Sequence, residues 1–284
     1  YGLIDIFGGL QDLQSGILRA TDESFFKEDP LRFFRVMQFV GRFEMEPDAK
    51  LNEICKEIDI SNVSKERISE EFVKLFLKSK KPSLAIDWLD KVGRLKEILP
   101  ELYDTKIIEQ NPEWHPEGNV FEHTKQAMNF AAQQSYESDE EKILQVASAM
   151  CHDLGKVAST KVENGRIRSV GHENTGVPFA KKLMSRITDK KDLIKKVAVL
   201  TKYHMCPGNY LSNGAKDATY KKLAWKLDKE GALTMVQLHR LFCADRAGRN
   251  AEGGGPLENG GQPCVDFLDK ASRLSILSGP ERPI

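Results

Sequence analysis

Apolar residues recur with the 3.6-residue period of amphipathic helices from Asp22 almost to the end of the chain, and this pattern restricts the chain to a helical fold. In the stretch from residue 25 to 43, one face of the helical wheel is apolar and the neighbouring face is basic. The apolar face holds Phe33, Val36, Met37, Val40 and Phe43, and the basic face holds Arg32, Arg35 and Arg42. Pro30 is tolerated in a first helical turn, where Glu28 and Asp29 favour the positive end of the helix dipole.

Further helices are predicted by the same periodicity over residues 49–58, 64–78, 83–97, 119–134, 139–151, 173–187, 189–203, 217–229, 231–248 and 264–277. Residues 1–20 indicate short β-type pieces separated by glycines, and Asn164-Gly165 indicates a small loop or hairpin. The Gly-rich segment after Arg249 is expected to be an irregular loop. We therefore predict an all-α protein with a short β-like remnant at its N-terminus.

Composition limits the partners and the compartment. The 42 basic and 42 acidic residues give a net charge of zero, so any contact with RNA would need a local basic stripe. No apolar run approaches the roughly 20 residues that span a bilayer, so no membrane partner is expected. Five scattered cysteines without CxxC spacing favour reduced thiols and a cytoplasmic location. The first residue is Tyr1 rather than Met, and we expect the chain to be a fragment or a processed form.

Histidines and aspartates form an ordered set along the second half of the chain, in the order H…HD…H…H…D. Its members are His123, His152, Asp153, His172, His204 and Asp245. Adjacent helical residues point about 100° apart, so the His152-Asp153 pair can reach one ion only at the end or edge of a helix. Imidazole and carboxylate together suit divalent first-row ions, and a carboxylate can bridge two of them.

The chemistry expected of such a set is hydrolysis of phosphate esters. A divalent ion lowers the pKa of bound water from 15.7 to roughly 7 and withdraws charge from a phosphoryl oxygen. His152 and Asp153 are the predicted catalytic pair, and Lys156 is placed to add a positive charge against the phosphate. Lys156 is equally well explained as a charge at a helix C-terminus.

Taken one at a time, these residues can also be explained by ordinary structural roles. A lone histidine on a helix is usually a core or surface residue, and an HD dipeptide occurs often by chance. The complete ordered set, with HDLGK and a distant ADRAGR, favours a site. His239 is expected to pack or face solvent, His115 is a candidate substrate contact without further support, and Cys151 is expected to be a small buried residue.

The motifs WHPEGNVFEHT, AMCHDLGK, GRIRSVGHENTGVP, KYHM and ADRAGR resemble the HD domain attached to bacterial CCA-adding enzymes of the tRNA nucleotidyltransferase/poly(A) polymerase superfamily. DIFGGLQDLQSGILR resembles the end of that family's catalytic head, and SFFKEDPLRFFRVMQFVGRF with SKERISEEFVKLFL and GRLKEILPEL resembles its neck. The resemblance implies four parts: a head remnant (1–20), a helical neck (21–105), an HD phosphohydrolase domain (106–250) and the start of a C-terminal body (251–284).

The resemblance also implies roles for particular residues. Asp29, Arg32 and Arg35 match the neck positions that pair with the base of CTP or ATP, although a solvated basic face explains them too. His123, His152, Asp153 and Asp245 match a core metal quartet. His172 and His204 match positions used for a second ion, so one or two ions are possible. The activities implied are 2′,3′-cyclic phosphodiesterase, 2′-nucleotidase and phosphatase, with nickel, manganese, magnesium or another first-row ion as cofactor.

The chain departs from the family in lacking the head's Gly-Ser loop and DxD or DxE pair. We therefore expect no nucleotide polymerisation from this chain alone, with CTP and ATP as substrates only of an intact parent protein. Two alternatives to the hydrolase stay open. The HD bundle is either a cradle for the tRNA acceptor stem around a structural metal, or an incidental part of a nucleotidyltransferase that adds CCA or poly(A). The expected partners are an RNA or tRNA 3′ end and small nucleotides.

Overall fold

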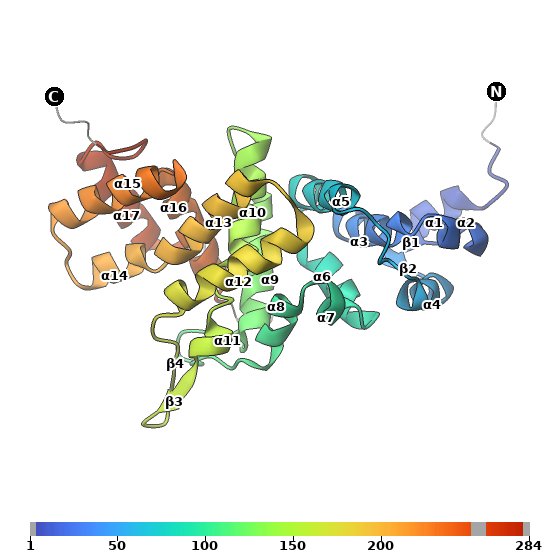
Figure 1. The fold of residues 1–284 in the computed structure, drawn as a ribbon, viewed down its shortest axis with the longest axis horizontal. Coiled ribbons are helices and arrows are strands. Elements are labelled where there is room, and N and C mark those ends of the chain that lie inside the picture. Colours follow the sequence, from blue (N-terminus) through green and yellow to red (C-terminus); the bar gives the residue numbers. More distant parts are fainter. Residues whose placement is uncertain (1–3, 251–259, 281–284) are drawn as a thin grey trace.

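The computed structural model describes residues 4–250 and 260–280 and is elongated and almost entirely helical. Helices follow one another roughly from one end of the molecule to the other, with the N-terminal helices at one end and the C-terminal helices at the opposite end (Figure 1). A single contiguous cluster of buried apolar side chains runs through this arrangement. The predicted all-α fold class is confirmed.

The N-terminal segment is more helical than its sequence predicted. Residues Gly9–Ser15 form α1 between Gly8 and Gly16, whose φ angles of 70° and 68° are left-handed. These glycines therefore flank a helix and do not separate strands, and only the two-residue strand β1 (Ile17–Leu18) remains of the expected β pieces. Strand β1 pairs in parallel with β2 (Glu46–Pro47), and residues 1–3 of the predicted remnant lie outside the described residues.

The first bundle packs around α3 (Leu31–Phe43), whose apolar face is buried as predicted except for its last member. Phe43 is 49% exposed because α3 ends there and Glu44 adopts a left-handed conformation. The helix that packs before α3 is α2 (Glu23–Glu28), and those that follow are α4 (Ala49–Glu57), α5 (Lys65–Lys78) and α6 (Ser83–Lys91).

The single helix predicted over residues 83–97 is wrong in its second half. Helix α6 ends at Lys91, because Gly93 takes a left-handed φ of 75° that turns the chain. Arg94 then donates from Nη1 to the carbonyls of Cys55 and Ile58, and so covers the end of α4. Three short helical segments follow: α7 (Leu95–Ile98), α8 (Pro100–Tyr103) and η1 (Asp104–Ile107).

The second bundle is built around α10 (Asp139–Cys151), in which every residue from 143 to 151 is buried. Its neighbours are α9 (Val120–Gln133), α12 (His172–Ile187), α13 (Lys191–Tyr203) and α16 (Met235–Ala247). Successive residues that are all buried show that protein surrounds the helix, which makes α10 the central element of this bundle.

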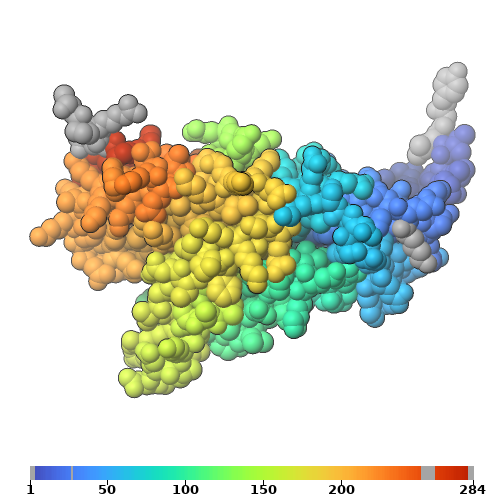
Figure 2. Space-filling model, viewed as in Figure 1, coloured from blue at the N-terminus to red at the C-terminus, as the bar shows by residue number. Residues whose placement is uncertain are grey.

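A hairpin projects from the second bundle below α11 (Lys156–Ser159), as Figures 1 and 2 show. Its antiparallel strands are β3 (Lys161–Glu163) and β4 (Arg166–Arg168). Asn164 and Gly165 form the turn with φ angles of 50° and 73°, a combination that asparagine and glycine adopt most readily. The predicted loop or hairpin at this position is therefore a hairpin.

The C-terminal end consists of α14 (Cys206–Ser212), α15 (Asp217–Gly231) and α17 (Gln262–Arg273). Helix α14 was not predicted; Pro207 lies in its first turn, a position that proline fits. Helix α16 begins at Met235 and not near residue 231, because Thr234 and Gln237 form a capping box there. Most of the predicted Gly-rich loop (251–259) lies outside the described residues. Within the described ranges, no helix combines the length and apolarity that crossing a membrane requires.

Candidate metal centre

The six histidines and aspartates predicted as metal ligands come from three helices of the second bundle, α9, α12 and α16, and from the residues that directly follow α10 and α13. Three of them lie at helix ends, because His152 and His204 follow the last residues of α10 and α13 and His172 begins α12. His123 lies in the second turn of α9, and Asp245 lies in the last turn of α16. The expectation that the His152-Asp153 pair sits at the end of a helix is thus met.

The first group of side chains gathers around His123. Its Nε2 atom lies 3.1 Å from Nε2 of His152, 3.2 Å from Oδ1 of Asp245 and 3.6 Å from Oδ2 of Asp153. All of these side chains are buried. The atoms of His123, His152 and Asp153 lie within 4.8 Å of one another, which is close enough to hold one ion.

The second group shares Asp153. Its other oxygen, Oδ1, lies 3.1 Å from Nε2 of His172 and 3.6 Å from Nε2 of His204, and these two nitrogens are 3.1 Å apart. The two oxygens of one carboxylate therefore face two different pairs of histidines. This is the arrangement expected of a carboxylate that bridges two cations.

The hydrogen bonds of the imidazole rings test whether the cluster fits a cation. Nδ1 of His152, His172 and His204 lies 2.7–2.8 Å from a backbone carbonyl oxygen, which can only accept, so Nδ1 carries the proton. In a neutral ring Nε2 then presents a lone pair. Each close Nε2 pair brings two lone pairs together, and only an added proton or a metal ion makes that contact favourable.

The balance of charge leads to the same conclusion. Burial alone would raise the carboxyl pKa of Asp153 and of Asp245, but the cations Lys156 and Arg249 and the nearby histidines hold both values well below their usual range. Nζ of Lys156 lies 2.7 Å from Oδ2 of Asp153, and Arg249 forms a two-pronged contact with Asp245 at 2.8 and 3.0 Å. Both carboxylates are thus ionised at neutral pH.

A third buried carboxylate, Glu117, was not predicted. Its Oε1 lies 2.8 Å from Nδ1 of both His115 and His123, and its side chain is 0% exposed. Burial raises its pKa, but the hydrogen bonds from His115 and His123 outweigh that effect and lower the value to about 2. Three buried carboxylates thus face Lys156 and Arg249, and the remaining negative charge is balanced either by a proton on His123 or by a bound cation that displaces this proton.

Glu117 also places His115, the residue proposed from the sequence as a substrate contact. Nδ1 of His115 is turned toward Glu117, and the ring lines the same cavity as Asp153. The other two predictions for single residues hold: His239 lies 3.3 Å from the sulfur of Cys243 and joins none of these groups, and Cys151 is completely buried. The sequence signal that could have identified Glu117 is its place between two histidines, His115 and His123, in the motif HPEG.

Close backbone packing explains the glycine of HDLGK. A Cβ atom on Gly155 would collide with the carbonyl oxygen of His172 and with the backbone of Gly176. Glycine therefore allows the turn after Asp153 to lie directly against the start of α12. The close approach keeps Asp153 within reach of His172.

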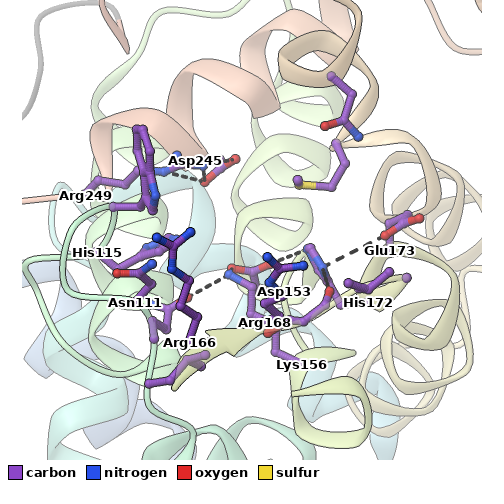
Figure 3. A pocket seen from close by; sticks show the side chains of 18 residues that line it. Asn111, His115, Asp153, Lys156, Arg166, Arg168, His172, Glu173, Asp245 and Arg249 are labelled. Carbon is purple, nitrogen blue, oxygen red and sulfur yellow. Dashed lines mark hydrogen bonds and ion pairs between the residues drawn. The ribbon is translucent and has the colours of Figure 1, made fainter. Parts of the chain in front are cut away.

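A cavity of about 620 Å³ opens over the cluster. It is lined by Asp153, Lys156, His172 and Asp245 at its base, and by Arg166 and Arg168 from β4 (Figure 3). This volume is in the range of roughly 300–1,000 Å³ typical of small-ligand sites. The buried ionised groups therefore have access to a ligand.

The residues matched to the nucleotide-pairing neck lie in the first bundle. Arg32 and Arg35 line a smaller cavity of about 200 Å³, and Nε of Arg32 is buried without a hydrogen-bond partner. Asp29 does not line this cavity, because its carboxylate is 3.1 Å from Nη2 of Arg67 on α5. The structure thus brings the two arginines together and turns the aspartate to another partner.

Comparison with protein families gives separate matches for a segment of the first bundle and for the second bundle. Residues 120–247 match the HD domain, and residues 42–105 match a family described as the probable RNA and SrmB-binding site of polymerase A. The helical fold and its His/Asp cluster thus define a protein that carries an HD domain next to a poly(A) polymerase-type RNA-binding segment.

Individual relatives are more specific. The "Multifunctional CCA protein" of Mannheimia succiniciproducens is 30% identical over 284 residues, covering 96% of this chain and 64% of that protein. The same-named protein of Hahella chejuensis is 31% identical, covering 94% and 61%. The solved Thermotoga maritima CCA-adding enzyme complexed with tRNA has the same fold, with a TM-score of 0.55 at 16% identity over 95% of this chain and 54% of that one. The chain is thus similar over nearly its whole length to CCA-adding enzymes, and it spans less than two thirds of these relatives' length.

Proposed function

We propose that the second bundle is a divalent-metal-dependent phosphohydrolase that acts on 2′,3′-cyclic phosphodiesters, 2′-phosphates and other phosphomonoesters. The observation that carries the proposal is the position of Asp153, whose two oxygens each face a close pair of histidine Nε2 atoms. No combination of neutral imidazoles satisfies these contacts without a cation.

The proposed ligands fall into two sets that share Asp153. The first is His123, His152, Asp153 and Asp245, and the second is Asp153, His172 and His204. A set rich in imidazole favours first-row ions such as nickel, whereas magnesium and manganese prefer oxygen ligands. A bound ion would supply hydroxide at neutral pH and withdraw charge from the phosphoryl group.

The reaction consumes one water molecule. For a 2′,3′-cyclic phosphodiester, the water oxygen bonds to phosphorus, one ring P–O bond breaks, and a water proton ends on the released ribose oxygen. Lys156 is buried beside the cavity, so its ammonium group would attract the substrate phosphate without competition from bulk water. His115, held by Glu117, lies in the same cavity and would contact the leaving side of the substrate.

The test is hydrolysis of 2′,3′-cyclic AMP and of a generic phosphodiester with a panel of divalent ions. Wild-type protein should turn over substrate only with metal, and the variants His152→Ala and Asp153→Ala should lose that turnover. His239→Ala is the matched control, because that histidine lies outside the cluster. Absence of turnover with every ion, together with retained tRNA binding, would favour a structural metal in an RNA-binding cradle.

A second function is favoured by the cavity in the first bundle. We propose that Arg32 and Arg35 pair with the base of CTP or ATP in an intact protein that adds nucleotides to a tRNA 3′ end. The buried, unpartnered Nε of Arg32 supports this, because such a donor gains a hydrogen bond when a base enters. Asp29 would have to leave Arg67 to join them. In a protein with a catalytic head, Arg32→Ala should reduce incorporation of CTP and ATP, and Lys65→Ala, which removes an exposed ion pair, should not.

The remaining expectations belong to the same proposals. The division at residues 20, 105 and 250, the tRNA 3′ end and small nucleotides as partners, and the cytoplasmic location all follow from the family resemblance and the unpaired cysteines. The relatives whose names refer to CCA addition and tRNA support tRNA as a partner.

A further inference from the structure

The cavity above the metal cluster contains two sets of positive charges that differ in their partners. Lys156 and Arg249 are paired with carboxylates of the cluster. Arg166 and Arg168 on β4 line the same cavity, yet neither has a carboxylate within ion-pair distance among the described residues. A single phosphate bound at the cluster would lie beside Lys156 and Arg249 and would leave the two arginines of β4 without a partner.

The hairpin directs both unpaired arginines to one side. Residues two apart on a strand face the same side, so Arg166 and Arg168 project together, and Figure 3 shows both side chains rising from β4 into the cavity. Glu163 stands opposite Arg166 in the strand register, but it forms no ion pair with it. The two guanidinium groups are therefore available to bind an anion in a forked, two-pronged contact.

An exposed tryptophan lines the same cavity from another segment. Trp114 is 62% exposed, which is unusual for so large an apolar side chain. Its loop is nevertheless well held, because Asn111 accepts hydrogen bonds from the backbone N–H of Trp114 and His115 through its carbonyl and from Glu113 through its side chain. An indole on a braced loop beside unpaired arginines is the combination that binds single-stranded nucleic acid, with bases stacked on the ring and phosphates on the cations.

We propose that Trp114, Arg166 and Arg168 form a subsite for the nucleotides that precede the reacting phosphate, so that the substrate is the 3′ end of a single-stranded RNA and not a free mononucleotide. This rests on the proposed function for the identity of the reacting phosphate at the cluster. A terminal phosphate would lie beside Lys156, the preceding internucleotide phosphate would lie on Arg166 and Arg168, and a base would stack on Trp114. A mononucleotide has no second phosphate for the arginines.

Binding tests the subsite without any need for turnover. In metal-free protein, a 5′-labelled trinucleotide with a 3′-phosphate should bind at least about 10-fold more tightly than the matching mononucleotide, measured by fluorescence anisotropy and by competition. The double variant Arg166→Ala/Arg168→Ala should remove most of this advantage. It should also reduce the slope of log K against log salt by about 0.7, which is the value expected for the loss of one phosphate contact on a single strand.

Matched variants separate the subsite from general surface charge and from misfolding. Lys161→Ala removes an exposed cation from the same hairpin, opposite Arg168 but outside the cavity, and should keep the trinucleotide advantage. Trp114→Ala should weaken trinucleotide binding by roughly 5- to 150-fold, and Trp114→Phe should restore part of the loss. Equal affinity for trinucleotide and mononucleotide in the wild type, or equal effects of the arginine and lysine variants, would overturn the proposal.

Kinetics with metal then distinguish failure of the subsite from failure of the hydrolase. Turnover that shows no preference for the trinucleotide would contradict the subsite and leave the hydrolase intact. Selective trinucleotide binding without turnover under any ion would support the subsite and contradict the hydrolase. If both hold, the ratio of kcat/KM for trinucleotide over mononucleotide should fall toward one in the double arginine variant, chiefly through KM.

Discussion

Replacement of Glu117 should weaken metal binding although this residue is not among the proposed ligands. Its Oε1 accepts hydrogen bonds from Nδ1 of His115 and His123 at 2.8 Å, and Nε2 of His123 faces the cluster. A carboxylate on the far nitrogen fixes the orientation of the ring and increases the basicity of the metal-facing nitrogen. Loss of such a partner typically reduces metal affinity about 10- to 100-fold, which corresponds to about 1.4–2.7 kcal/mol.

Two substitutions divide this effect into charge and geometry. Glu117→Gln keeps an oxygen that accepts from His123 and loses the negative charge, so we expect a loss of about 10-fold. Glu117→Ala loses both and should approach about 100-fold. The measurement is calorimetric titration with Mn²⁺ or Ni²⁺ at pH 7, beside thermal unfolding of the metal-free protein. Glu113→Gln, an exposed acid in the same loop, is the matched control.

The reasoning would be refuted by a Glu117→Gln protein that binds metal within about twofold of the wild type. The side chain would then serve only to fill space. A variant whose metal-free form unfolds well below the wild type would show a structural role, and the affinity ratio of Glu117→Gln to Glu117→Ala would still report on the hydrogen-bond acceptor.

Three further predictions concern packing, metal removal and pH. Gly155→Ala should lower the free energy of unfolding by about 3 kcal/mol and disturb the site, because the new Cβ has no room beside His172. Gly208→Ala is the control, because a Cβ there meets only ordinary contacts, and denaturant unfolding of both variants measures the difference. A chelator should lower Tm, and metal at 100 times Kd should add about 2.7 kcal/mol to the free energy of unfolding, as calorimetry can measure. Burial lowers the pKa of His123, but Asp245 and Glu117 outweigh it and raise the value to about 9 in the metal-free protein, so a metal must displace that proton. The protonated form of His123 stabilises the metal-free fold below pH 6.5, and this stabilisation is lost as pH rises through 9. Metal affinity should therefore increase from pH 7 to 9, with about one proton released per ion. A metal affinity that does not change with pH would contradict this prediction.

The proposed metal ligands were predictable because each has a chemical identity that the sequence displays directly. Histidine and aspartate at ordered positions near helix ends indicate a site without knowledge of the fold. Glu117 carries no such mark, since it is an acid between Pro116 and Gly118 in a segment without periodicity. Only tertiary structure turns that loop under α9 and removes the carboxylate from water.

The errors in the predicted helices also arise where the local sequence lacks the deciding information. Periodicity identified most helices, but it does not register a left-handed turn such as Gly93, where two helices share one apolar pattern. Helix α14 was missed because its seven residues are too few to display a helical period. The pairing of Asp29 with Arg67 joins residues 38 positions apart, and no local pattern contains that information.

The central position of Asp153 has a consequence for how the chain unfolds. Helices α9, α10, α12, α13 and α16 each end or turn at the same cluster, and residues from 123 to 245 meet there. A bound ion would therefore act as a cross-link that closes several long loops at once, a role that disulfides have in other proteins. Local opening of any one of these helices would then require release of the ion, and the second bundle would exchange its buried amide hydrogens as a single unit.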